Sequence, residues 1–139
     1  MPVRYLLDTN MLSALMNHPD GHLAARVASV ISSRGIICTS IIVAAEARFG
    51  VAKKGSERLR RQVEQLLSEI DVLPFESNAD EYYAVLRAQL ERRGTPIGGN
   101  DMLIAAQALA TDSILVTNNV REFARVRGLR IENWLESGK

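Results

Sequence analysis

The sequence is poor in cysteine, histidine and aromatic residues, and each shortage argues against a class of function. A single cysteine, Cys38, rules out an internal disulfide, and its apolar run IICTSIIV is typical of a small buried thiol. The two histidines, His18 and His22, stand alone in NHPDGH, so neither a zinc site nor a serine triad is supported. One tryptophan, three tyrosines and three phenylalanines offer no evident platform for stacking single-stranded bases.

The chain also lacks a charge excess and any long hydrophobic run. Its net charge is +1, so binding to a nucleic acid must come from a local patch of cations. No run is long enough to span a bilayer or to serve as a signal peptide. Neither a GxxxxGK[ST] loop nor a GxGxxG turn is present. With 47% apolar and 24% charged residues, the sequence predicts one cytoplasmic globular domain over residues 1–139.

What is present is an alternation of short apolar runs and longer helical patterns. The apolar runs, rich in Val, Ile and Leu, predict buried strands at 3–7, 36–39, 70–73 and 114–117, with a weaker one at 129–131. Helical periodicity covers 10–16, 23–32, 41–52, 57–68, 79–93 and 101–110. This order predicts an α/β fold with three α/β/α layers around a central, mainly parallel sheet of about five strands.

Polar side chains lie where several of these apolar segments begin or end. Asp8 follows the first strand, Asp101 opens a helix, Glu46 lies inside IIVAAEARFG, and Thr117 and Asn119 close the fourth strand. In a parallel sheet, ligands bind beyond the carboxyl ends of the strands. Carboxylates that converge there raise each other's pKa or recruit a divalent cation, and their hard oxygens suit Mg²⁺ or Mn²⁺. The set therefore predicts metal-assisted hydrolysis.

Each acid taken alone also has an ordinary explanation. Asp8 fits a turn that caps a helix, and Asp101 in a first helical turn complements the helix dipole. For Glu46, the alternative is a carboxylate neutralised by an arginine such as Arg48 or Arg87. Glu46 is nevertheless expected on a core-facing stripe, because its neighbours three and four positions away are apolar: Ile42, Val43, Phe49 and Gly50.

Four segments together resemble a known family. They are YLLDTNML, TSIIVAAEARFGVAKK, LRAQLERRGTPIGGNDMLIAAQALA and ILVTNNVREFARVRGLRIENW. In this order the chain resembles PIN-domain ribonucleases, specifically the toxin of VapBC-type bacterial toxin–antitoxin pairs. The family's acidic positions fall on Asp8, Glu46 and Asp101. A fourth position, often Asp, falls on Asn119, with Thr117 as an accessory hydroxyl.

The resemblance implies an Mg²⁺- or Mn²⁺-dependent endoribonuclease that leaves 5′-phosphate and 3′-hydroxyl ends. Asp8 and Asp101 would be the metal ligands, and Glu46 would orient or deprotonate the attacking water. Thr117 and Asn119 would complete the surrounding shell. Asn119 adds no negative charge, so one cation is expected and a second is left open. Ser40 is a further candidate for that shell, or else the N-cap of the helix that follows it.

The resemblance also implies partners. The expected substrate is structured RNA such as transfer RNA, whose cleavage would stop translation. The expected partners are a second copy of the chain and a cognate VapB-type antitoxin whose tail lies in a groove. Local cations would have to hold the RNA; the candidates are Lys53, Lys54, Arg58, Arg60, Arg61, Arg92, Arg93, Arg121, Arg125 and Arg127.

Three alternatives compete with this interpretation. A catalytically inactive PIN scaffold would gain nothing from keeping mutually repelling acids. A haloacid-dehalogenase-like phosphatase needs a second Asp two residues after Asp8, where this chain has Asn10. A receiver domain needs an acidic pair near the first strand and a phosphorylated Asp after a middle strand, and IICTS offers none.

Overall fold

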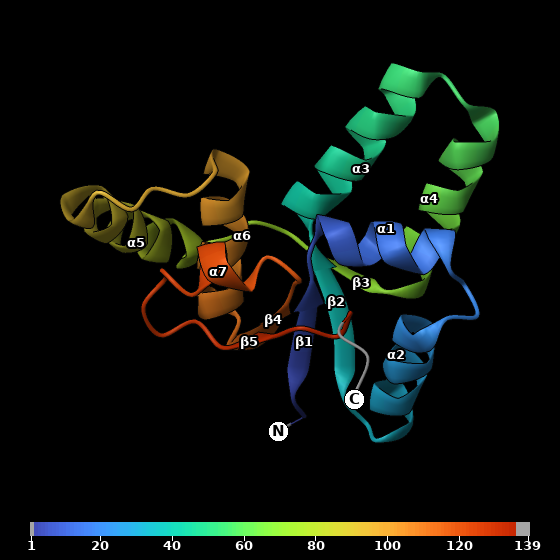
Figure 1. The fold of residues 1–139 in the computed structure, drawn as a ribbon, viewed down its shortest axis with the longest axis horizontal. Coiled ribbons are helices and arrows are strands. Elements are labelled where there is room, and N and C mark those ends of the chain that lie inside the picture. Colours follow the sequence, from blue (N-terminus) through green and yellow to red (C-terminus); the bar gives the residue numbers. More distant parts are fainter. Residues whose placement is uncertain (1, 136–139) are drawn as a thin grey trace.

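Five short strands pair in parallel in the computed structural model, which describes residues 2–135 (Figure 1). They are β1 (Arg4–Leu7), β2 (Ile36–Ser40), β3 (Asp71–Leu73), β4 (Ser113–Val116) and β5 (Ile131–Glu132). Their order in the sheet is β3-β2-β1-β4-β5, so the first strand of the chain is the central one. Leu7 pairs with Thr39 on one side and with Val116 on the other. The α/β fold with a parallel five-stranded sheet is confirmed.

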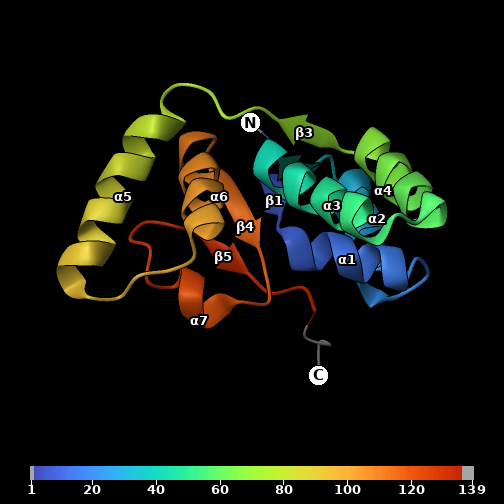
Figure 2. The ribbon, with the colours of Figure 1, turned by 90° about the horizontal axis from the view of Figure 1, so that it is seen from above.

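Seven helices surround the sheet: α1 (Thr9–Asn17), α2 (His22–Ser32), α3 (Ile41–Lys54), α4 (Glu57–Glu69), α5 (Ala79–Arg93), α6 (Gly99–Ala110) and α7 (Val120–Phe123). Seen from above, α5 and α6 lie together to one side, and α1 to α4 gather on the opposite side (Figure 2). The predicted strands and the six longer helices match to within two residues at each end. Helix α7, of four residues, was not predicted.

Local sequence explains where the helices begin and end. Ser40 and Ser56 cap α3 and α4, because their hydroxyls accept hydrogen bonds from the amides of Ile42 and Leu59. Gly55 and Gly94 end α3 and α5 in the left-handed conformation that residues with a Cβ rarely adopt. Start and stop signals therefore bound α3 at both ends, and further signals begin α4 and end α5.

The core runs along both faces of the central strands. Leu6, Leu7, Leu115 and Val116 are fully buried, as strands covered on both faces require. Cys38 is buried as predicted, and burial raises the pKa of its thiol to about 12, so it stays protonated. None of the helices that the structure describes is long and apolar enough to cross a membrane.

The end of the described chain is held by aromatic packing. Trp134 is buried, and its ring lies 5.0 Å from that of Tyr5, centroid to centroid. Trp134 also contacts Arg26, whose guanidinium lies over the ring at 4.8 Å from its centroid. Trp134 thus packs the C-terminal segment onto the body, and its ring is not available for base stacking.

Candidate functional site

Asp8 lies where β1 passes into α1, and it caps that helix. Its Oδ1 accepts a hydrogen bond from the amide of Met11 at 3.1 Å, while its own amide donates to the carbonyl of Val116. Only 6% of the residue is exposed. Burial raises the pKa of this carboxyl, although the Thr117 hydroxyl and the Met11 amide oppose the rise. Asp8 is thus a buried acid with neutral donors and no cationic partner among the described residues.

Thr117 and Asn119 follow the neighbouring strand, β4, at the same edge of the sheet. Thr117 is fully buried, and its hydroxyl accepts a hydrogen bond of 2.9 Å from the amide of Asn119. The Asn119 side chain donates to Glu122. The two loops are also tied together, because the Asn10 amide donates to Asn118 at 3.0 Å. The pairing of β1 with β4 therefore brings Asp8, Thr117 and Asn119 together, as the sequence predicted.

Glu46 lies in the middle of α3 and is held by two neutral donors. Thr9 donates to its Oε1 at 2.5 Å, and Asn100 donates to its Oε2 at 3.0 Å. The alternative in which an arginine neutralises it is wrong. Arg48 forms an ion pair with Glu64, and Arg87 forms one with Glu91, each at the surface: Arg48 Nε lies 2.9 Å from Glu64 Oε2 and Arg87 Nε lies 3.0 Å from Glu91 Oε2.

The expected core-facing stripe around Glu46 is only partly correct. Val43 and Ala44 are fully buried, but Phe49 is 67% exposed. Glu46 therefore lies on the side of α3 that contacts Thr9 of α1 and Asn100 of α6, and not on the side that packs into the core. Spacing alone could not show this, since a phenylalanine three positions away is also compatible with an open surface.

Asp101 lies in the first turn of α6 and faces a fourth acid, Glu122 of α7. Burial and, after it, the hydrogen bond to Glu122 raise the pKa of Asp101 to about 7, with smaller contributions from the charges on Glu122, Glu46 and Asp8. Burial alone would raise the pKa of Glu122, but the Gly98 amide, the Asn119 amide and Asp101 outweigh it and lower that pKa. The proton of this pair therefore resides on Asp101.

Sequence reasoning did not find Glu122. The residue follows TNN in a short polar stretch with arginines at 121 and 125, where a surface glutamate is ordinary. The only available signal was its position three residues after Asn119, which is the spacing of one helical turn. The four-residue helix α7 forms that turn and places Glu122 beside Gly98. The Gly98 amide donates a hydrogen bond of 2.9 Å to the Glu122 carboxylate.

The donor set of this site fits a hard divalent cation. Four carboxylates, those of Asp8, Glu46, Asp101 and Glu122, lie around one edge of the sheet, and among residues 2–135 none forms an ion pair. As the side chains lie, the described residues contain no group of three or more acids, histidines or cysteines placed to hold an ion. Each carboxylate instead takes hydrogen bonds from neutral donors or shares a proton. The oxygen chemistry and the mutual repulsion suit Mg²⁺ or Mn²⁺, which would have to displace that proton.

Three of the predicted RNA-binding cations have structural partners, and others have no ion pair with a described residue. Arg93 donates to the carbonyl of Arg125, and Arg125 donates to the carbonyl of Pro96 at 2.9 Å. Arg60 pairs with Glu57 on its own helix. By contrast, the cations around the α3–α4 turn have no ion pair with any described residue: Lys53, Lys54, Arg58 and Arg61.

A groove leads from the acids to these cations. It has a volume of about 280 Å³ and lies between α1, α3 and α4, with Thr9 and Glu46 at one end and Lys54 at the other. Its walls are largely apolar and include Leu12, Met16, Ala47, Leu59 and Val63. The groove therefore has apolar walls, an acidic end at Glu46 and a basic end at Lys54.

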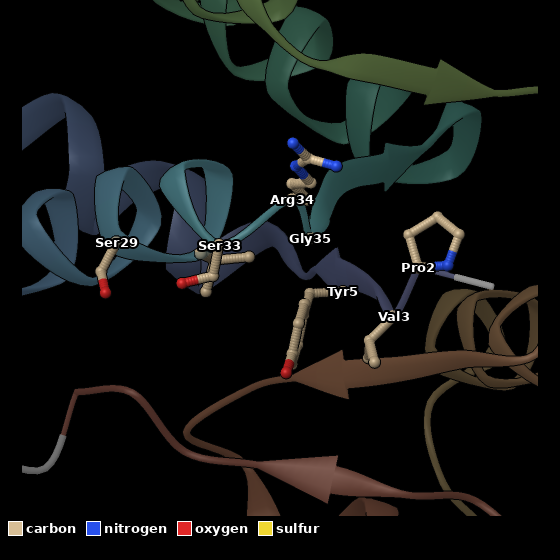
Figure 3. Close-up of a pocket in the computed structure, with 8 residues that line it drawn as sticks. Pro2, Val3, Tyr5, Ser29, Ser33, Arg34 and Gly35 are labelled. Atoms are coloured by element: carbon tan, nitrogen blue, oxygen red, sulfur yellow. The ribbon is translucent and has the colours of Figure 1, made fainter.

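Two other features fall outside the site. Ser40 is fully buried, and its hydroxyl accepts from the Ile42 amide at 2.9 Å, which makes it the N-cap of α3. A cavity of about 670 Å³ lies near the amino end of β1, lined by Val3, Tyr5, Ser29 and Ser33 among others (Figure 3). That cavity has no acid in its lining and lies at the opposite end of β1 from Asp8.

Comparison with known proteins gives a consistent answer over nearly the whole chain. The family model described as "PIN domain" matches residues 5–129. The chain is 39% identical to "Ribonuclease VapC2" of Rickettsia felis over 132 residues, covering 94% of this chain and 97% of that protein. It is 35% identical to "tRNA(fMet)-specific endonuclease VapC" of Salmonella typhimurium, covering 95% and 98%. Its fold matches a chain in the crystal structure of VapBC2 from Rickettsia felis bound to a promoter DNA fragment, with a TM-score of 0.89, 35% identity and coverage of 95% and 99%.

Proposed function

The chain belongs to the VapC group of PIN-domain proteins, and on that premise we propose that it is a metal-dependent endoribonuclease toxin. It hydrolyses phosphodiester bonds of structured RNA, with transfer RNA as the substrate class, and so stops translation and growth. Residues 1–139 act as one PIN-like domain in the cytoplasm, where the substrate is found. The substrate class is supported by the Salmonella relative, whose name specifies tRNA(fMet).

One observation carries this proposal: acids from four separate elements gather at the carboxyl edge of the sheet, and none of them forms an ion pair with any residue between 2 and 135. Asp8, Glu46, Asp101 and Glu122 reach the edge from the end of β1, from α3, from α6 and from α7. Asp101 retains a proton up to a pH of about 7, since burial and the hydrogen bond to Glu122 raise its pKa. A protein gains no stability from such an arrangement, so a ligand of opposite charge is its most economical explanation.

We assign the metal to Asp8 and Asp101, with Glu122 as a further carboxylate able to reach it. A bound Mg²⁺ or Mn²⁺ supplies a Lewis acid that activates water and offsets the charge developing on the phosphate. Glu46 takes the proton from the attacking water, because its two oxygens are already oriented by Thr9 and Asn100. Thr117 holds Asp8 in place, and Asn119 holds Glu122.

We propose that the antitoxin binds in the groove between α1, α3 and α4. Its apolar walls suit an amphipathic segment, and its acidic end, at Glu46, suits a cationic side chain of that segment. An occupant there covers the approach to the acids and so inhibits the enzyme. The crystal structure of the Rickettsia felis pair supports a complex of this kind, since it contains both VapB and VapC. We also propose a homodimer; Tyr82 and Val85, exposed on α5, are available for its interface.

Cleavage of total bacterial RNA by the purified protein in Mn²⁺ or Mg²⁺, with every new end sequenced, tests the proposal. We expect discrete cuts in transfer RNA that carry 5′-phosphates and disappear in EDTA and in Asp101→Asn. Cleavage that persists in EDTA would contradict the metal requirement. Metal binding without any cleavage would favour an inactive scaffold that binds RNA or protein.

A further inference from the structure

Glu46 is held by the immediate neighbours of two other acids of the site. Thr9, which donates to its Oε1, follows Asp8 in the chain, and Asn100, which donates to its Oε2, precedes Asp101. The three acids come from elements far apart in sequence, at positions 8, 46 and 101. These two hydrogen bonds are therefore the direct links between Glu46 and the two segments that carry Asp8 and Asp101.

We infer that Thr9 and Asn100 are positioning residues for the reaction, which together set the place and the acceptor state of the Glu46 carboxylate. This inference rests on the proposed function and adds two residues to which the sequence analysis assigned no role in the reaction. Neither residue is assigned a direct contact with substrate or metal. Their effect is exerted through Glu46.

The geometry of the two hydrogen bonds restricts the carboxylate in two ways. Each oxygen accepts one bond, so rotation of the carboxylate about its last carbon–carbon bond would break both. A hydroxyl and an amide NH₂ thus donate to the two oxygens of the carboxylate, one bond to each. Neither donor carries a charge, so Glu46 is oriented without being neutralised.

Orientation by neutral donors differs from orientation by an arginine, because an arginine would also add a positive charge beside Glu46. A guanidinium would orient Glu46 equally well, but it would compete with a cation for the carboxylate and lower its basicity. The nearby arginines are instead used elsewhere, Arg48 on Glu64 and Arg87 on Glu91. Thr9 and Asn100 thus supply orientation while the negative charge of the site is kept.

The test uses two substitutions that each remove one donor, and a third that keeps the donor at position 9. Thr9→Val replaces the hydroxyl by a methyl group, Thr9→Ser keeps the hydroxyl, and Asn100→Ala removes the amide. The matched control is Gln65→Ala, because Gln65 donates a similar bond of 2.8 Å to an exposed glutamate, Glu69, away from the site. All variants are compared with wild type by RNA cleavage kinetics in Mn²⁺ and by thermal unfolding with and without Mn²⁺.

We expect Thr9→Val and Asn100→Ala to lower kcat by about 10- to 100-fold, as loss of a residue that orients a metal-site group commonly does, with KM for RNA little changed. Thr9→Ser should restore most of the activity, and Gln65→Ala should match wild type. In a Glu46→Ala background, Asn100→Ala should cost nothing further, because the side-chain oxygen that accepts its hydrogen bond is already gone. A full additional loss in that background, or wild-type kcat in both single variants, would overturn the inference.

The failure of this inference is distinguishable from failure of the proposed function. If wild type neither cleaves RNA nor gains thermal stability from Mn²⁺, the proposed function is wrong and the positioning role falls with it. If wild type cleaves RNA and is stabilised by Mn²⁺, and Thr9→Val and Asn100→Ala cleave RNA at the wild-type rate, only the positioning role is wrong. If Asn100→Ala unfolds at a clearly lower temperature than wild type, it is replaced by Asn100→Ser. Serine has a shorter side chain without the amide donor, and position 100 is exposed.

Discussion

At the residue scale, Asp8 has two roles that a single substitution can separate. Its Oδ1 caps α1 through the Met11 amide, and its charge is buried beside the other acids. Asp8→Asn keeps the oxygen that accepts the capping bond and removes the charge. We expect RNA cleavage to fall by about 100-fold or more, while the melting temperature in EDTA stays the same or rises because a buried charge is removed.

Ser56→Ala is the control for capping alone. Ser56 caps α4 by accepting from the Leu59 amide at 3.1 Å, away from the acids. Its loss should cost about 1 kcal/mol of unfolding free energy and leave cleavage unchanged. If Asp8→Asn cleaves RNA at the wild-type rate, the assignment of Asp8 to the metal is wrong.

The pKa of Asp101 makes a prediction about stability and pH. Its ordinary value is 3.8, and burial with the Glu122 hydrogen bond raises it to about 7 in the folded protein. Between these values the folded state holds a proton that the unfolded state has lost, so stability falls as pH rises through this window. Glu122, whose pKa is lowered, loses its contribution only in more acidic solution.

Thermal unfolding in EDTA from pH 4.5 to 8 measures this effect. We expect the wild-type melting temperature to fall between pH 4.5 and about 7 and to level off above that, and we expect the fall to be smaller in Asp101→Asn. A slope from Asp8 remains in both proteins, since burial raises its pKa as well. Equal slopes in the two proteins would show that Asp101 does not hold the proton.

At the scale of elements, α7 and the loop between α5 and α6 are fastened to each other. Arg125 donates to the Pro96 carbonyl, Arg93 donates to the Arg125 carbonyl, and the Gly98 amide donates to Glu122. These bonds place the start of α6, and with it Asp101, against Glu122. Arg125 is therefore a structural residue in this fold, although the sequence suggested it as a contact for RNA.

Arg125→Ala tests that role. We expect faster amide hydrogen exchange at Ile97 and Gly98, a loss of about 1 kcal/mol of unfolding free energy from the missing bond, and a lower kcat with KM for RNA unchanged. Arg121→Ala, an exposed arginine on the same short helix, is the control and should change none of these. A raised KM with unaltered hydrogen exchange would instead indicate that Arg125 contacts RNA.

The elements that the sequence predicted are those with strong local signals. Strands of Val, Ile and Leu and helices of more than two turns were found to within two residues. Helix α7 escaped because four residues cannot show a period of 3.6, and Glu122 was missed with it. The partners of Glu46 were also beyond prediction, since Thr9 and Asn100 reach it only after three distant segments have packed.

At the scale of the whole molecule, a nearly neutral protein must bind a polyanion through a local patch. Lys53 and Lys54 end α3, and Lys54 lies at the basic end of the groove. We expect Lys53→Glu combined with Lys54→Glu to raise KM for RNA by about tenfold or more and to flatten its dependence on salt, because fewer counterions are released on binding.

Arg34→Glu, at the opposite end of the sheet beside the larger cavity, is the control for net charge. It should leave KM close to the wild-type value, and all these variants should keep the wild-type kcat. If Arg34→Glu weakens binding as much as the lysine pair does, the field of the whole molecule rather than the groove holds the RNA.

The sheet order β3-β2-β1-β4-β5 has a consequence for how the protein is made. The central strand β1 is synthesised first, but its partner β4 arrives only at residues 113–116, so their pairing closes a loop of most of the chain. Asp8 and Thr117 cannot meet before that pairing forms. A ribosome that has not yet translated β4 therefore carries no assembled catalytic centre, and the enzyme can act against translation only once this strand has been made and has paired with β1.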